Sequence, residues 1–128
     1  MSKVLIADDE EDVSAMIGAS LCRCGYEVFY ALNGKAAIEA AKREKPDIIL
    51  LDLRFPKPGM DGIEILTAIR KFDKEVKVIL TSGLGPEAKE VEGAQGLGIS
   101  KFLPKPLNIA QLKETLKEMV GDNTGKPR

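Results

Sequence analysis

Five polar side chains in this sequence stand at or just beyond the ends of short apolar runs. Asp8 and Asp9 follow one run, Asp52 follows a second, Thr81 closes a third, and Lys105 lies shortly after a fourth. Carboxylates at short range repel one another unless a cation neutralises them, and a ligand set made only of oxygen atoms suits a hard ion such as Mg2+. A carboxylate nucleophile beside a divalent ion and an ammonium group has the parts that phosphoryl transfer uses.

A single site can form only if the fold gathers the ends of these runs. Short apolar runs alternate with amphipathic helical stretches five times along the chain, which is typical of a doubly wound α/β fold with a central parallel sheet. The predicted strands cover residues 3–7, 26–31, 47–51, 76–81 and 100–103, and the predicted helices begin near residues 12, 33, 61, 86 and 108. In such sheets ligands bind outside the carboxyl ends of the strands, where the strand order reverses.

Each of these polar residues also has an ordinary explanation when it is taken alone. An aspartate after a strand can favour the positive N-terminus of the next helix or form an Asx-turn. A threonine or lysine at a strand end is commonly a solvated surface residue. Their coincidence at four strand ends around one crevice favours a joint functional interpretation.

The composition indicates one globular domain and excludes several kinds of chemistry. The chain has 128 residues, of which 44% are hydrophobic and 30% are charged, and a domain of this size buries enough surface to fold unaided. The net charge of −1 offers no general reason to bind nucleic acid or an anionic membrane. Without histidine and with only two cysteines, the chain lacks the side chains for an ordinary zinc site or a histidine-based catalytic triad.

The two ends of the chain favour a domain at residues 1–120 followed by a flexible tail or the start of a linker at residues 121–128. The last eight residues carry no apolar periodicity. The first apolar stretch meets an acidic segment after residue 7, so it is too short for a signal peptide or a membrane span. We therefore expect a cytoplasmic location.

Five ordered segments of the chain match one known protein family. They are Val4 to Glu10, Ile49 to Leu53, Met60 to Gly62, Ile79 to Gly83 and Phe102 to Leu107. Through them, and over about residues 3–120, the sequence resembles the receiver domains of bacterial response regulators in two-component signal transduction. The resemblance implies a flavodoxin-like α/β fold, doubly wound, with five helices around a five-stranded parallel sheet in the order 2-1-3-4-5.

The same resemblance implies a phosphoacceptor site that uses Mg2+. Asp52 would be phosphorylated, and the protein ligands of the metal would be Asp9 directly, Asp8 through water, Asp52 itself and the backbone carbonyl of Arg54. The phosphoryl group would come from a histidine kinase or a phosphotransfer protein. The chain would catalyse its own phosphorylation and dephosphorylation and would not be a conventional enzyme.

The response to phosphorylation is also implied by the resemblance. Thr81 would bind a phosphoryl oxygen, Lys105 would pair with it, and Phe102 would swing inward as Thr81 moves. The side chains of Arg54 and Gly83 would flank the path of the hydrolytic water and so set the lifetime of the phosphorylated state. The fourth helix, fifth strand and fifth helix would form the output surface for a downstream partner and could support a weak dimer.

Two features depart from the family pattern. The segment from Leu53 to Met60 is longer than the commoner receiver loop, and Arg54 is an unusual residue two positions after the phosphoacceptor. The resemblance itself also implies a cis peptide bond between Lys105 and Pro106, since cis bonds occur almost only before proline. The longer loop leaves the phosphoacceptor in place but changes the rim of the site.

One alternative is a haloacid-dehalogenase-like phosphatase, which also combines an aspartate nucleophile with Mg2+ on an α/β sheet. Such enzymes carry a second carboxylate two residues after the nucleophile, where this chain has Arg54. Without that acid and base, fast turnover is not expected.

A second alternative is a nucleotide-binding module, since Gly83, Gly85 and Ala88 match a G-x-G-x-x-A pattern. The pattern follows the fourth predicted strand instead of the first, and Pro86 removes a backbone donor that a phosphate would need. We interpret these glycines as turn residues.

A third alternative is a pseudo-receiver that docks to partners without being phosphorylated. A pure scaffold has no physical need for the carboxylate cluster of Asp8, Asp9 and Asp52, so these residues favour a phosphoacceptor. Titration with Mg2+ distinguishes the two, because a scaffold of this kind would not respond.

Overall fold

The computed structural model describes residues 2–55, 59–83 and 89–120 of the 128-residue chain. Five strands and five helices alternate along these residues, and each strand begins and ends within one residue of its predicted bounds. The strands are β1 (Lys3–Ala7), β2 (Glu27–Ala31), β3 (Ile48–Asp52), β4 (Lys77–Ser82) and β5 (Lys101–Pro104). The helices are α1 (Glu11–Arg23), α2 (Gly34–Glu44), α3 (Gly62–Arg70), α4 (Lys89–Gln95) and α5 (Ile109–Val120).

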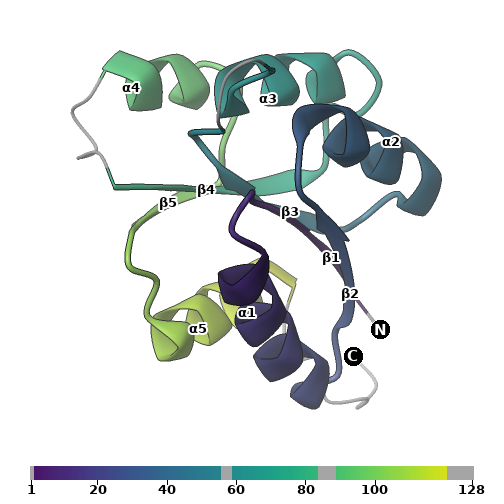
Figure 1. Cartoon of the computed structure of the whole chain (residues 1–128), viewed down its shortest axis with the longest axis vertical. Helices are drawn as coiled ribbons and strands as arrows, with labels where there is room; N and C mark the ends of the chain where they lie inside the picture. Colours follow the sequence, from purple (N-terminus) through teal and green to yellow (C-terminus); the bar gives the residue numbers. More distant parts are fainter. Residues whose placement is uncertain (1, 56–58, 84–88, 121–128) are drawn as a thin grey trace.

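The sheet has the predicted topology. Its strand pairs are all parallel, and the order across the sheet is β2-β1-β3-β4-β5. Figure 1 shows α2, α3 and α4 on one face of the sheet and α1 and α5 on the other. The strand order reverses between the neighbours β1 and β3, so the crevice that such folds use for ligands lies at the carboxyl ends of these two strands.

The central strand β3 shows how the apolar pattern produces this arrangement. All five of its residues are buried. Ile49 and Leu51 belong to the core cluster that includes residues of α2, α3 and α4, while Ile48 and Leu50 belong to the cluster that includes residues of α1 and α5. A strand covered on both faces needs a continuous apolar run, because successive side chains point to opposite faces. Asp52 ends that run at the edge of the core.

Three of the helices begin at the predicted capping residues. The side chain of Asn33 accepts a hydrogen bond from the backbone N–H of Ala36, 2.9 Å away. Asp61 and the N3 residue Glu64 form a complete capping box at the start of α3. Asn108 accepts from the backbone N–H of Gln111 at 3.0 Å before α5. These bonds satisfy backbone donors that have no partner within the helix.

The guanidinium group of the last residue of α3 hydrogen-bonds the C-terminal end of the helix to two neighbouring loops. Arg70 donates to the backbone carbonyls of Leu97 and Gly98, which follow α4, at 2.9 and 3.0 Å. It also donates to the carbonyls of Asp73 and Val76, which precede β4, at 3.2 and 2.8 Å. The planar fork of arginine donors suits such a set of fixed acceptors. Arg70 therefore connects α3 to the segments that enter β4 and β5.

Two predictions fall on residues that the structure leaves undescribed. The tail predicted at residues 121–128 lies outside the described residues, as do residues 86–88 of the predicted fourth helix. The described part of that helix ends at Gln95. Among the described residues, no helix is both long enough and apolar enough to cross a membrane.

Candidate functional site

Backbone hydrogen bonds hold the residues that follow the strands at the carboxyl edge of the sheet. The N–H of Asp8 donates to the carbonyl of Ala31 at 3.1 Å, which continues the pairing of β1 with β2. The N–H of Leu53 donates to Thr81 at 2.9 Å, and the N–H of Lys105 donates to Ser82 at 2.8 Å. Because each bond extends an existing ladder, the backbone positions of the candidate site are set by the sheet and not by mobile loops.

The ammonium group of Lys105 lies at the centre of the site. Its Nζ atom donates to Oδ2 of Asp52 at 3.0 Å, to Oε1 of Glu10 at 3.1 Å and to Oδ2 of Asp8 at 3.2 Å. The side chains of Asp8 and Asp52 are only 8% and 6% exposed, whereas that of Glu10 is 55% exposed. One cation therefore faces three carboxylates, two of them buried.

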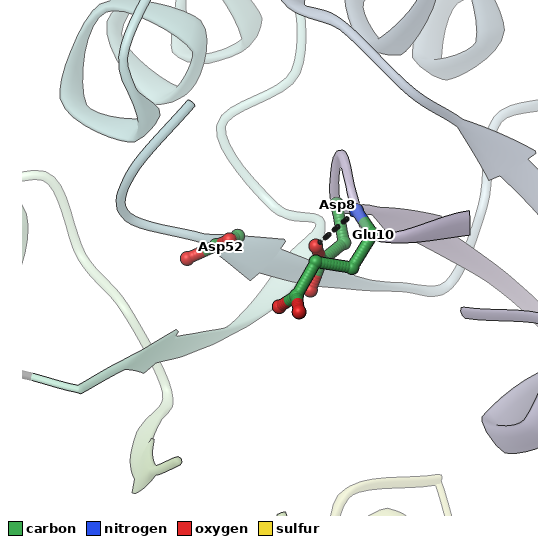
Figure 2. A group of neighbouring side chains, drawn as sticks. All are labelled: Asp8, Glu10 and Asp52. Carbon is green, nitrogen blue, oxygen red and sulfur yellow. Dashed lines mark hydrogen bonds between the residues drawn. The ribbon is translucent and has the colours of Figure 1, made fainter. Parts of the chain in front are cut away.

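Backbone N–H groups orient the two buried carboxylates. Oδ1 of Asp8 accepts from the N–H of Glu10 at 2.9 Å, which Figure 2 draws as a dashed line. Oδ1 of Asp52 accepts from the N–H of Arg54 at 3.1 Å. In both residues one oxygen thus contacts the backbone and the other contacts Lys105. This division fixes the direction in which each carboxylate points.

The carboxylates lie close enough together to share one metal ion. Oxygen atoms of Asp8, Glu10 and Asp52 lie within 4.8 Å of one another. The donors are all hard oxygen atoms, and a single ammonium group leaves a net negative charge among them. Both properties fit a hard divalent cation such as Mg2+.

Burial and ion pairing act on the ionisation of Asp52 and Lys105 in different directions. Burial raises the pKa of Asp52, and this effect outweighs the hydrogen bonds from Lys105 and Arg54 that lower it. Burial alone would lower the pKa of Lys105, but the hydrogen bond and negative charge of Asp52, together with Asp8 and Glu10, raise it above its ordinary value. Lys105 is therefore protonated at neutral pH, while Asp52 is a carboxylate that ionises less readily than one in water.

A cavity of about 540 Å3 opens beside Asp52. Asp9, Arg54, Gly83 and Lys105 are among the residues that line it. Asp9 is exposed and faces the same cavity as the phosphoacceptor candidate. A Cβ atom on Gly83 would meet no atom of the described residues within 4 Å. Asp9, Arg54 and Gly83 thus line the same cavity as Asp52.

Thr81 and Phe102 lie on the two strands next to Asp52. Thr81 is the register partner of Asp52, and its buried hydroxyl donates to the carbonyl of Leu51 at 3.4 Å. Phe102 is the register partner of Leu80 and packs, half-buried, against the core cluster on the α2–α3–α4 face. The peptide between Lys105 and Pro106 is cis, as predicted. The residues that the sequence singles out therefore lie on or just after four neighbouring strands of the sheet, β1, β3, β4 and β5.

The sequence did not indicate that Gly62 supports the site. A Cβ atom on Gly62 would lie 2.5 Å from the backbone oxygen of Asp52, and the N–H of Gly62 donates to Leu53 at 2.8 Å. Only glycine allows α3 to begin so close to the end of β3. Contact between Glu10 and Lys105 was also not predicted, although the position of Glu10 directly after the aspartate pair was a signal that could have suggested it.

Comparison with known proteins identifies the family to which the chain belongs. The family model of the response regulator receiver domain matches residues 4–117. The chain belongs to this family, whose members are the receiver domains of two-component response regulators. Membership of this family argues against the phosphatase and nucleotide-binding alternatives. Gly85 and Ala88, two residues of the G-x-G-x-x-A pattern, lie outside the described residues.

Individual relatives agree with this assignment. The chain is 33% identical over 116 residues to sporulation initiation phosphotransferase F of Bacillus subtilis, covering 91% of each chain. It is 34% identical over 118 residues to chemotaxis protein CheY of Thermotoga maritima, covering 91% of this chain and 96% of that one. A solved N-terminal domain of an uncharacterized Wolinella succinogenes protein is similar with a TM-score of 0.86 and 31% identity, covering 94% of both chains. The chain spans about half the length of other curated relatives that are named as transcriptional regulators.

Proposed function

We propose that the chain accepts a phosphoryl group on Asp52 in a reaction that depends on Mg2+, and that it signals by changing conformation. The donor is a phosphohistidine of a histidine kinase or a phosphotransfer protein. The observation that carries the proposal is the contact of one protonated lysine with the buried Asp52 carboxylate at the carboxyl edge of the sheet. Membership of the receiver family supports it.

The residues at the edge fit the metal. Asp9 would bind Mg2+ directly, Asp8 through water, and Asp52 and the carbonyl of Arg54 would complete the protein ligands. When bound, the ion neutralises charge on the carboxylates and on the phosphoryl oxygens. The acidic group of Asp8, Glu10 and Asp52 supports a cation at this edge, since its oxygen atoms converge on a region small enough for one ion. Asp9 is not part of that group and lines the neighbouring cavity.

In the transfer step, an Asp52 carboxylate oxygen forms a bond to phosphorus as the bond between phosphorus and the donor's imidazole nitrogen breaks. The electron pair of the breaking bond stays with that nitrogen. Lys105, already positioned 3.0 Å from Asp52, donates to a phosphoryl oxygen and stabilises its negative charge. Arg54 and Gly83, which line the same cavity, flank the path of the water that later hydrolyses the acyl phosphate.

A second cavity supports an approach route for the donor protein. It measures about 430 Å3 and joins the site to α1 and α5, because Asp8, Glu10 and Lys105 line it together with apolar residues. Met16 on its wall is 59% exposed, and Leu107, which follows Lys105 in the sequence, lines the same cavity. A partner helix that carries the phosphohistidine could bury this apolar surface while its imidazole reaches Asp52.

The phosphorylated state would be transmitted by Thr81 and Phe102. The Thr81 hydroxyl would exchange its bond to Leu51 for one to the phosphoryl group, and Phe102 would move into the space that Thr81 vacates. The surface of α4, β5 and α5 would then change for a downstream partner or for a weak dimer. A cytoplasmic location is part of the same proposal.

Intact-protein mass spectrometry tests the function. With a small acyl phosphate and Mg2+, the parent protein should gain the mass of one phosphoryl group, because the donor needs only the metal, Asp52 and Lys105. Asp52→Asn should gain none, and excess chelator should prevent the gain in the parent. An unmodified parent protein would instead support the docking-only pseudo-receiver, and an unchanged gain in Asp52→Asn would refute the assignment of Asp52.

A further inference from the structure

Every hydrogen-bond donor of the Lys105 ammonium group is already in use. An ammonium group has three N–H donors, and Nζ of Lys105 has three acceptors between 3.0 and 3.2 Å. If Lys105 is to donate to an oxygen of a phosphoryl group that approaches Asp52, one of these bonds must break. This step rests on the proposed function.

The three acceptors differ in what it costs to release them. While the phosphoryl group approaches, Asp8 and Asp52 are both still buried carboxylates, and a buried carboxylate that loses its cation at this stage is left without compensation. The Glu10 side chain is 55% exposed, so water can solvate its carboxylate after release. Glu10 is therefore the acceptor that Lys105 gives up at the lowest cost.

The local backbone leaves the Glu10 side chain available for this task. Glu10 occupies the N-cap position of α1 in an extended conformation, and its side chain makes no capping hydrogen bond. Its backbone N–H donates to Asp8, so the main chain of Glu10 is fixed independently of its carboxylate. Substituting the side chain consequently leaves the backbone support of Asp8 in place.

We propose that Glu10 is a positioning residue that holds Lys105 in the unphosphorylated site and is displaced by the incoming phosphoryl group. It thereby competes with the phosphoryl oxygens for the ammonium group. The competition stabilises the unphosphorylated state and slows phosphorylation. Loss of the contact should shift both the rate of phosphorylation and the affinity for phosphoryl mimics in the same direction.

Two variants of Glu10 and one matched control separate this contact from the effect of charge. Glu10→Gln removes the charge, and Glu10→Asp keeps it on a side chain that is one methylene shorter, which draws the carboxylate back from Lys105. Glu11→Gln removes an equal charge from the adjacent, exposed residue in the first turn of α1, for which no contact with Lys105 is recorded. Thermal unfolding of all variants checks that the fold is retained.

The measurement is the rate of phosphorylation by a small acyl phosphate at saturating Mg2+ and high salt, which screens long-range charge effects. We expect Glu10→Gln and Glu10→Asp to react about two- to fivefold faster than the parent, the range that a partly exposed ion pair supports. Glu11→Gln should match the parent. The affinity for a beryllium fluoride mimic, measured by titration, should rise by a similar factor in the two Glu10 variants only.

The outcomes distinguish failure of this inference from failure of the proposed function. If the parent is phosphorylated but Glu10→Asp reacts at the parent rate, or if Glu11→Gln matches Glu10→Gln, the contact has no role and the inference is wrong. A slower reaction in both Glu10 variants would mean that Glu10 assists Lys105 and does not compete with the phosphoryl group. A parent protein that is never phosphorylated would overturn the proposed function and the inference together.

Discussion

At the scale of single residues, the chemistry proposed for Asp52 is accompanied by a cost in stability. Asp52 is buried next to Asp8, and within the described part of the chain its carboxylate accepts hydrogen bonds from the ammonium group of Lys105 and from the backbone N–H of Arg54. Burial raises its pKa, so the native state holds the proton more tightly than the unfolded chain does. Ionised Asp52 therefore lowers the free energy of unfolding. This destabilisation disappears as the pH falls from the pKa of Asp52 in the folded state to its lower pKa in the unfolded chain.

Asp52→Asn should accordingly raise the free energy of unfolding by about 1 kcal/mol at neutral pH without Mg2+, a size common for relief of a destabilised functional site. The gain should shrink as the pH is lowered through the folded-state pKa of Asp52. Urea denaturation across pH measures both effects. Asp12→Asn, an exposed change in α1, should alter stability by less than about 0.5 kcal/mol. A gain that stays constant with pH would show that ionisation of Asp52 is not its cause.

Arg54 offers a second residue-scale prediction, on the lifetime of the phosphorylated state. Its exposed side chain lies on the cavity that contains Asp52, and a guanidinium group cannot act as a base. If it covers the phosphoryl group, Arg54→Ala should lose phosphate about tenfold faster, which corresponds to roughly 1.4 kcal/mol of barrier. Dephosphorylation followed at equal Mg2+ in the two proteins measures this. Slower loss in the variant would mean that Arg54 assists hydrolysis, as an arginine finger does.

Sequence alone predicted which residues meet at this edge because strand ends can be located from apolar runs. It could not predict that Glu10 reaches Lys105, which lies 95 positions away in the sequence. That contact depends on the extended backbone of Glu10 at the start of α1. The need for glycine at position 62 was equally hidden, since it arises from the approach of α3 to the carbonyl of Asp52.

At the scale of elements, Arg70 connects the end of α3 to the segments that follow α4 and precede β4. Its guanidinium group donates to four backbone carbonyls around α3, α4 and β4. Arg70→Ala should lower the free energy of unfolding by about 2 kcal/mol, because these partly buried carbonyls lose charged donors. Hydrogen exchange should also rise between Ala94 and Ser100, where two of the four carbonyls lie.

Arg43→Ala is the matched control for that measurement. Arg43 is on the surface of α2 and pairs only with its neighbour Glu44 among the contacts recorded for the described residues, with a side chain that is 65% exposed. Its removal should change stability by less than about 1 kcal/mol. Equal effects of the two substitutions would show that the carbonyl contacts of Arg70 do not hold the loops.

The elements themselves were largely predictable. Fully buried runs such as Ile48 to Leu51 mark strands without ambiguity, and residues such as Asn33 and Asp61 mark helix starts through local hydrogen bonds. The start of α1 was placed one residue late, since Glu10 is an unusual N-cap whose side chain is engaged elsewhere. The link from Arg70 to the loops was not predictable, because it joins residues that only the packed fold brings together.

At the scale of the whole molecule, three adjacent strands connect Asp52, the proposed phosphoacceptor, to the proposed output surface. Asp52 on β3 is the register partner of Thr81 on β4, and Thr81 is the partner of Leu103, next to Phe102 on β5. The predicted strand order made this adjacency foreseeable, since order 2-1-3-4-5 places these strands side by side. A change at Asp52 therefore has a short path to β5 and to the helices α4 and α5.

The central claim is that occupancy of Asp52 changes the packing of Thr81 and Phe102, and an NMR comparison tests it most directly. Backbone amide spectra are recorded with Mg2+, before and after addition of a beryllium fluoride mimic of the phosphoryl group. We predict shifts at Thr81, at Phe102 and along α4, no shifts from the mimic in Asp52→Asn, and loss of the shifts at Phe102 and α4 in Thr81→Ala. Shifts confined to the residues around Asp52 and Lys105 in the parent protein would contradict the account.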